Sequence, residues 1–257
     1  SRVTGERTYS WGKIEARMTG MASSTQYTAV DDGWIRTKES AEYDSLGRIT
    51  QTHDHGDPDD PGDDQCTRYT YADNPNLRIL DTVARTEKLA IACGTTPTYP
   101  DDVISDERSL FDGGGFTDAP TVGLETSSQR IMEYNGSTPT YQVVKESEYD
   151  AYGRTVSETD ALGNVTETTY TSAVPGGTAT TVTTSNPLGH TETEHLDPAR
   201  GLPLVEIDAN NNRTDMAYDP LGRLTQVWTP DWKKADGVDP AMRVEYHVSN
   251  DAPTVVA

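Results

Sequence analysis

Carboxylates gather in one short stretch of this sequence, HDHGDPDDPGDD at residues 53–64. Oxygen ligands at near-alternate positions around a glycine can converge on Ca²⁺, which makes Asp57, Asp59 and Asp63 candidate calcium ligands. The stretch lacks the frame of an EF-hand loop and its final glutamate. A solvated acidic loop rich in proline and glycine is therefore the alternative interpretation.

Two histidines open the same stretch. His53 and His55 are separated by one residue and would point the same way on a strand. A transition-metal site needs further convergent ligands, and the spacing identifies no third one. We therefore predict no metal centre at these histidines.

Signatures of catalysis are missing from the sequence. It contains no GxSxG elbow, no HExxH pair, no Walker GxxxxGK[ST] loop and no GxGxxG after a strand. Paired carboxylates are uninformative in a chain with 42 Asp and Glu. The GGG at 113–115 follows Phe111 and Asp112, which favours a degenerate turn over a phosphate cradle. We expect neither enzyme activity nor a cofactor.

Cys66 and Cys93 are the two cysteines of the chain. In an extracellular protein an isolated pair usually forms a disulfide, and closing this loop would contribute on the order of 3 kcal/mol. Two reduced and separately buried thiols are the alternative.

The net charge restricts the partners. The chain carries 21 Lys and Arg against 42 Asp and Glu, a formal charge of −21. Nucleic acids and anionic membranes are bound mainly through Lys and Arg, so we expect neither as a partner. No run approaches the roughly 18 apolar residues that span a bilayer. Because the N-terminus has no initiator Met and no signal-peptide pattern, we expect a fragment or a processed piece.

The composition is compatible with disorder, because aliphatic residues are few and the charge is high. Thirteen Tyr and four Trp supply further apolar area, which favours a folded β protein with a thin core. Alternating polarity predicts strands over 141–149 and 243–248, where Val244, Tyr246 and Val248 share one face.

Other strand signals are β-branched runs, such as TATTVTTS at 178–185 and TRYTY at 67–71. Helical periodicity is weak. Only 86–93 and 106–111 are compatible with a turn or two of helix, and the first is equally compatible with a strand.

A phrase of the form Tyr-Asp-x-x-Gly-Arg occurs three times in the chain. In the third copy Pro220 suits the second position of a type I turn, and Gly222 can adopt a positive φ. Asp219 can accept a backbone N–H two residues on, and Arg223 begins the return strand. The phrase is thus predicted to be a hairpin corner. The corner residues are Tyr43, Asp44, Gly47 and Arg48; Tyr149, Asp150, Gly153 and Arg154; and Tyr218, Asp219, Gly222 and Arg223.

Related corners lie between these copies, at DALGNVT from 160, NPLGHTE from 186 and DANNNRT from 208. Each starts with Asp or Asn and contains a Gly or Asn that can turn left-handed. Equivalent strand ends recur at Tyr149, Tyr170, Leu196 and Tyr218, roughly every 22 residues. The spacing predicts a repeated antiparallel meander in which each unit packs only against its neighbours.

On these corners the chain resembles the YD repeats of bacterial RHS-repeat proteins, which are similar to the B and C components of insecticidal toxin complexes and to teneurins. The resemblance is strongest over 141–230 and 40–54. It implies an all-β strip of hairpins that curves into part of a hollow shell, commonly around a toxin domain encoded downstream. The family's terminal self-cleavage region has no copy here, and LDPARGL at 196–202 is interpreted as an ordinary corner.

The resemblance implies a secreted or cell-surface scaffold whose partners are further YD repeats and an enclosed toxin or effector domain. We expect a YD-repeat segment at 1–65, an inter-repeat segment at 66–140 and a regular array at 141–257, as one continuous architecture. The alternative function is an adhesion or carbohydrate-binding module, in which Trp228 and Trp232 would stack on glycans. Packing in the core is the other interpretation of these tryptophans.

Overall fold

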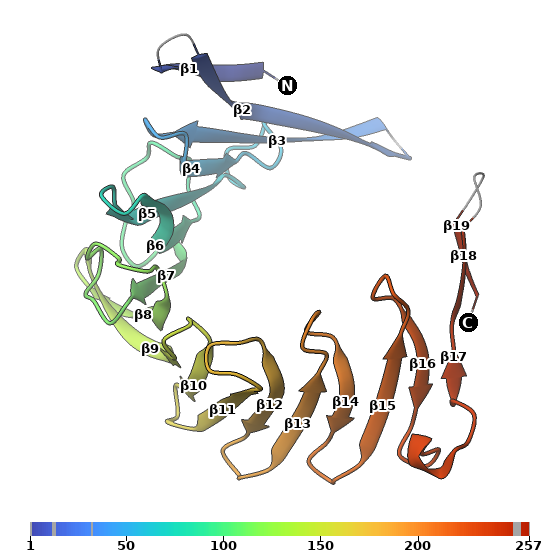
Figure 1. Cartoon of the computed structure of the whole chain (residues 1–257). Coiled ribbons are helices and arrows are strands. Elements are labelled where there is room, and N and C mark those ends of the chain that lie inside the picture. The colour runs from blue at the N-terminus through green and yellow to red at the C-terminus, as the bar shows by residue number, and fades with distance from the viewer. Residues whose placement is uncertain (1, 12–13, 32, 249–252, 257) are drawn as a thin grey trace. The chain divides into compact units, whose positions relative to one another are not determined.

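The computed structural model describes residues 2–11, 14–31, 33–248 and 253–256, and their side chains from Gly20 to Tyr246 (Figure 1). The chain divides into two compact units, Ser1–Glu146 and Ser147–Ala257. The boundary falls within one strand, β9.

In the first unit every strand pairs antiparallel with its successor along the chain. This order of pairing is the topology of a meander, since each connection is a hairpin. The strands are β1 (Arg2–Trp11), β2 (Ile14–Val30), β3 (Gly33–Tyr43), β4 (Ile49–Asp54), β5 (Gln65–Asn74), β6 (Ile79–Leu89), β7 (Val103–Phe111), β8 (Glu125–Asn135) and β9 (Thr138–Tyr149).

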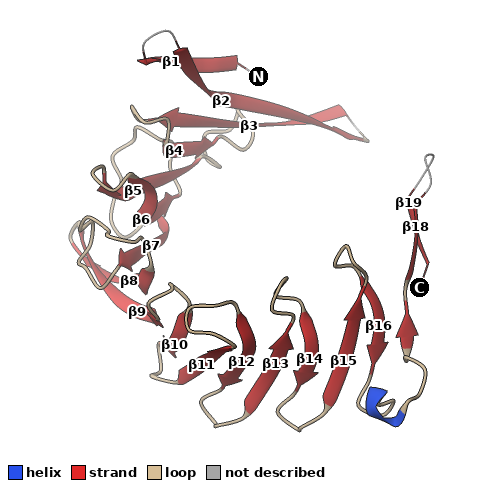
Figure 2. Cartoon of the chain, in the orientation of Figure 1, coloured by secondary structure: helices blue, strands red, loops and turns tan. Residues whose placement is uncertain are grey.

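The second unit repeats the plan with shorter strands (Figure 2). Strands β10 to β17 pair antiparallel in chain order, and β18 pairs with β19. A 3₁₀ turn, η1 (Lys234–Asp236), lies between β16 and β17. The strands are β10 (Thr155–Asp160), β11 (Val165–Ser172), β12 (Ala179–Ser185), β13 (Thr191–Leu196), β14 (Pro203–Ile207), β15 (Arg213–Tyr218), β16 (Leu224–Trp228), β17 (Met242–Arg243), β18 (Glu245–Val248) and β19 (Pro253–Val256).

The predicted all-β antiparallel meander is confirmed. The short helices allowed at 86–93 and 106–111 are wrong, because the first begins inside β6 and the second lies inside β7. There Thr86 pairs with Glu107 and Lys88 with Ser105. The backbone N–H and C=O groups of these segments therefore form hydrogen bonds between strands and are not available for the bonds within a helix. The strand predicted at 243–248 is interrupted at Val244, whose N–H donates to the carbonyl of Thr225.

The core is thin and half polar. Few described side chains are fully buried, and polar or charged side chains make up about half of them. Burying a carboxylate is costly unless it is paired, so pairing has to hold much of this core together. The buried residues include Cys66, Ala72, Ala84, Leu89, Val205 and Trp228, together with Glu87, Asp106, Ser127, Gln129, Ser147 and Asp215.

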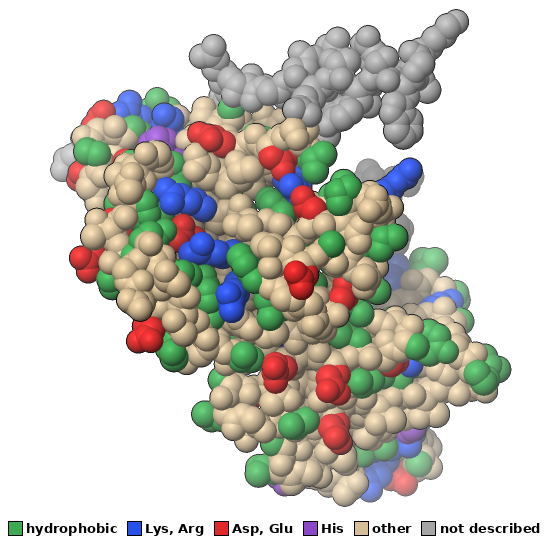
Figure 3. Space-filling model, turned by 90° about the vertical axis from the view of Figure 1, so that its left-hand side faces the viewer, with side chains coloured by type: hydrophobic (Ala, Val, Ile, Leu, Met, Phe, Trp, Pro, Cys, Tyr) green, Lys and Arg blue, Asp and Glu red, His purple; other side chains and the backbone are tan. Residues whose placement is uncertain are grey.

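Figure 3 shows acidic groups scattered singly or in small groups over the face turned to the viewer. Among the described residues, no helix is both long and apolar enough to cross a membrane.

Candidate functional site

Asp219 organises the last YDxxGR corner. Its N–H donates to the carbonyl of Arg223 at 2.9 Å, and its carbonyl accepts the N–H of Gly222 at 2.9 Å. Its carboxylate accepts the N–H groups of Leu221 at 2.9 Å and Arg223 at 3.0 Å, and Nε of Arg223 at 2.7 Å. With Gly222 at φ +80°, this is a type I turn completed by a left-handed glycine. One aspartate both closes the turn and orients the arginine.

The other two copies have the same bonds. Asp44 accepts Nε of Arg48 at 2.7 Å, and Asp150 accepts Nε of Arg154 at 2.7 Å. Burial raises the pKa of both carboxyls, but the hydrogen bonds that each accepts from its own loop together outweigh it, so each pKa lies below its usual value. At Asp219 the N–H of the arginine is the largest cause of the lowered pKa. All three carboxylates are therefore held ionised by their own loops.

The second kind of corner is the same loop with a different fifth residue. Asp160 accepts the backbone N–H of Asn164 at 2.9 Å and its side-chain amide at 2.8 Å. Asp208 bonds Asn212 in the same way, at 2.8 and 2.9 Å. Asn211 stands in the glycine position with φ +60°. An Arg reaches further beyond its own loop than an Asn, and the fifth residue of each YDxxGR corner contacts a neighbouring strand.

Gly163→Ala isolates the cost of the left-handed position. Gly163 has φ +81° and open space where a Cβ would stand, so only backbone strain opposes the substitution. We expect a loss of roughly 1 to 2 kcal/mol in the free energy of unfolding. Gly163→Asn should lose less, because Asn tolerates this conformation. Urea unfolding of both variants checks the order, and equal losses would contradict it.

Asp112 caps an enlarged corner. Its carboxylate accepts the N–H groups of Thr121, Val122, Gly123 and Leu124 at 2.7 to 2.9 Å. The GGG segment thus belongs to a turn, as predicted from Phe111 and Asp112. Burial raises the pKa of Asp112, but the four backbone donors outweigh it and lower the pKa to about 2.

The lowered pKa predicts acid sensitivity. Because the folded-state pKa of Asp112 lies below its ordinary value of 3.8, its contribution is complete above that value and is lost as the pH falls toward about 2. The contribution amounts to about 2 kcal/mol. Denaturant unfolding between about pH 6 and about pH 3 should show a shallower loss for Asp112→Asn than for wild type. Asp101→Asn, at an exposed aspartate, should follow wild type; identical profiles for all three proteins would contradict the prediction.

Each corner arginine stacks on a tyrosine from a later strand. The guanidinium carbon lies 4.2 Å from the ring centre of Tyr71 for Arg48, and 4.4 Å from that of Tyr246 for Arg223. Arg154 lies 4.4 Å from the ring centre of Tyr170. These cation–π contacts join neighbouring repeats.

The tyrosine hydroxyls complete the link. Tyr71 donates to the carbonyl of Ile49 at 2.8 Å, and Tyr246 donates to that of Leu224 at 2.9 Å, both across a separation of 22 residues. Tyr43 of the first YD corner donates to the carbonyl of Met21, also 22 residues back. The repeat spacing was the sequence signal for this contact. Spacing alone predicts only strand length, so it does not predict which arginine and tyrosine are paired.

The two tryptophans of the adhesion hypothesis lie in different surroundings. Trp228 is 7 % exposed and donates from Nε1 to the carbonyl of Val238 at 3.0 Å. Its burial removes it from a glycan-stacking role and favours the core-packing alternative. Trp232 is 54 % exposed.

A buried ionic cluster crosses β6, β7, β8 and β9. Asp106 is 0 % exposed and accepts two bonds from Arg85, at 2.8 and 2.6 Å. The hydroxyls of Tyr134 and Tyr141 donate to the same carboxylate at 2.6 and 2.9 Å. Burial and then the bond to Asp106 raise the pKa of both tyrosines, so they remain protonated donors. Sequence reasoning did not identify this cluster.

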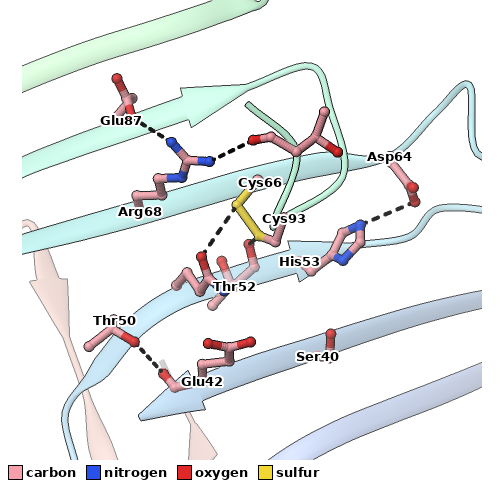
Figure 4. Close-up of a disulfide and its surroundings, with 12 residues drawn as sticks. Ser40, Glu42, Thr50, Thr52, His53, Asp64, Cys66, Arg68, Glu87 and Cys93 are labelled. Carbon is pink, nitrogen blue, oxygen red and sulfur yellow. Dashed lines mark hydrogen bonds and ion pairs between the residues drawn. A yellow bond between two sulfur atoms is a disulfide. The ribbon is translucent and has the colours of Figure 1, made fainter. Parts of the chain in front are cut away.

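The connection between β6 and β7 covers one side of this cluster. Tyr99 donates to Glu87 at 2.9 Å, and Glu87 also accepts a bond from Arg85 at 2.8 Å. A disulfide joins Cys93 in this connection to Cys66 on β5, with Cα atoms 5.0 Å apart (Figure 4). The connection is thus tied to the sheet covalently and by a buried charge.

The three candidate calcium ligands do not converge. Asp63 accepts the N–H of Asp57 at 2.9 Å, whereas Asp59 pairs with Arg36 at 2.7 Å. The single ligand group found among the described residues does not include them. These contacts favour the alternative interpretation, a solvated loop that uses its carboxylates for its own turns.

Within the part of the chain that the structure describes, the one group of convergent ligand atoms contains both histidines and Asp64. Its three ligand atoms lie within 4.8 Å of one another. Nε2 of His53 is 3.3 Å from Oδ1 of Asp64, and Nδ1 of His55 is 3.7 Å from the same oxygen. Burial is the largest cause of a lowered pKa at His55, which keeps its ring neutral. Asp64 is thus a third candidate ligand, which the spacing did not identify.

Solved structures provide the comparison. The chain matches the crystal structure of TcdB2-TccC3-Cdc42 with a TM-score of 0.58 and 9 % identity, over 97 % of this chain and 15 % of that chain. It matches that of TcdB2-TccC3 with the same score and identity, over 96 % of this chain and 15 % of that chain. No family model and no curated protein matches the chain. At this identity the likeness is one of fold, and at that level the resemblance to the RHS and YD-repeat proteins is confirmed.

Proposed function

We propose that this chain is a structural scaffold: a stretch of an RHS/YD-repeat wall that encloses or displays a toxin or another effector domain. The observation that carries the proposal is the match over 97 % of this chain to TcdB2-TccC3-Cdc42. The chain spans 15 % of that chain's length, so further repeats are its expected partners.

The corner chemistry supports a building role over a catalytic one. The carboxylates repeated along the chain accept bonds from their own loops, and the repeated arginines stack on tyrosines of the same chain. These groups stabilise turns and neighbouring strands. The proposed location is outside the cytoplasm, since the joined cysteines fit an oxidising compartment.

The test uses the complete product of the gene that encodes this segment. Electron microscopy should show a closed wall containing the segment, and a domain inside it should resist protease until the wall is opened by denaturant. A matched preparation of the same domain expressed alone should be digested at once. A full-length product with no chamber would contradict the proposal.

A glycan array tests the adhesion alternative on the isolated chain. A scaffold should show no saturable binding. Saturable binding that is lost in Trp232→Ala but kept in Trp34→Ala, a second exposed tryptophan, would favour a carbohydrate-binding module instead.

A further inference from the structure

We propose that His53, His55 and Asp64 form a binding site for a divalent transition-metal ion, with Zn²⁺ as the fitting probe. Nε2 of His53, Nδ1 of His55 and a carboxylate oxygen of Asp64 are the ligand atoms. The site is separate from the scaffold role, and nothing in that role requires it.

The strands position these side chains. His53 pairs with Ser40 across β3 and β4, and the N–H of His55 donates to the carbonyl of Lys38 at 2.8 Å. The two histidines therefore leave the same face of the sheet, with ring centres 3.6 Å apart. Asp64 directly precedes β5, whose Cys66 pairs with His53. The pairing of β4 with β5 thus brings the far end of the acidic loop back to the histidines.

One ring nitrogen at the proposed site lacks a hydrogen-bond partner. Nε2 of His53 is buried without a hydrogen-bond partner, although Oδ1 of Asp64 lies 3.3 Å away. The distance permits an ion pair, but the directions of the two groups do not make a hydrogen bond. A nitrogen and an oxygen at this separation match adjacent ligands of a tetrahedral ion, because bonds of about 2.0 to 2.1 Å place neighbouring ligands roughly 3.3 Å apart.

His55 already has the support that a metal ligand requires. Its second nitrogen, Nε2, is 3.0 Å from Oγ of Ser40. When Nδ1 binds a metal, Nε2 carries the proton and donates it to this oxygen, which holds the ring in place. In Figure 4 the side chain of His53 points toward Asp64. Ser40 lies on the neighbouring strand.

The donor chemistry selects the class of ion. Two imidazole nitrogens and one carboxylate suit zinc and its neighbours, whereas Ca²⁺ and Mg²⁺ take oxygen ligands. Three protein ligands leave one tetrahedral position for water. The ion would join both ends of the acidic loop at 53–64, since the histidines lie at its start and Asp64 at its end.

Calorimetric titration of the intact chain, without a histidine tag, tests the proposal. We expect one equivalent of Zn²⁺ to bind, and affinity to fall at least about tenfold in His53→Ala and in Asp64→Asn. Ser40→Ala should weaken binding by roughly tenfold with every ligand present. Co²⁺ in place of zinc should give the intense visible absorption of a tetrahedral site, which the two ligand variants should lose.

Matched controls separate this site from incidental binding. His190→Ala removes an exposed histidine in a turn of the second unit, and Asp57→Asn removes a carboxylate of the acidic loop; both should bind zinc as wild type does. Far-ultraviolet circular dichroism verifies that each variant is folded. Absence of zinc binding by wild type, equal binding by the ligand variants, or equal response to Ca²⁺ would overturn the proposal.

Discussion

Asp106→Ala should lower the free energy of unfolding by about 3 to 5 kcal/mol. The carboxylate is 0 % exposed and accepts bonds from Arg85, Tyr134 and Tyr141. Its removal takes from the half-buried guanidinium of Arg85 the carboxylate that accepts two of its bonds, and Glu87 remains as its partner. The two tyrosine hydroxyls lose their acceptor. Equilibrium unfolding in guanidinium chloride measures the loss. The effect should be large because this thin core has few apolar contacts to compensate.

Two further variants separate the charge from the packing. Asp81→Ala, at an exposed aspartate on the adjacent strand β6, should change stability by no more than about 0.5 kcal/mol. Arg85→Met combined with Asp106→Leu should recover part of the loss, since apolar side chains replace the buried ion pair while Glu87 keeps Arg68 and Tyr99 as partners. A loss in Asp106→Ala as small as that in Asp81→Ala would show that the cluster does not hold these strands together.

Reduction of the disulfide between Cys66 and Cys93 should cost about 3 to 4 kcal/mol, because the bond closes a long loop in the unfolded chain. The cysteines are 27 residues apart. Reduction also frees the β6–β7 connection, so Tyr99 is expected to release Glu87 more often. Denaturant unfolding with and without a phosphine reductant measures the first effect, and hydrogen exchange over 90–102 measures the second.

The double variant Cys66→Ala and Cys93→Ala is the control for the reductant. It should match reduced wild type, apart from the small packing change at buried Cys66, and should not respond to the reductant. Mass spectrometry after alkylation reports the oxidation state directly. Two freely alkylated thiols in native protein from an oxidising compartment would contradict the bond, and equal stability of oxidised and reduced protein would contradict its stabilising role.

The corners were predictable because their bonds are local. Asp219, Gly222 and Arg223 lie within one short loop, so residue type and spacing specify the turn. Repetition of this loop then specifies a meander, because each corner reverses the chain after a strand of similar length. The alternation at 141–149 similarly identified part of β9.

The connection at 172–179 illustrates a limit of this reasoning. The strand ends at Tyr170 and Leu196 lie further apart than the usual spacing of roughly 22 residues. The reason is that SAVPGGT, and not an Asp-x-x-Gly loop, joins β11 to β12. Spacing alone predicted a reversal there but not its form.

The sequence by itself determined the antiparallel meander, its Asp-centred corners and the likeness to YD repeats, since these depend on hydrogen bonds between residues a few positions apart. Only the tertiary structure decided that Arg48 stacks on Tyr71, that Asp106 is the centre of a buried cluster and that Asp64 meets the two histidines. The physical reason is register. These contacts join different strands, and a shift of one residue would turn each side chain to the opposite face.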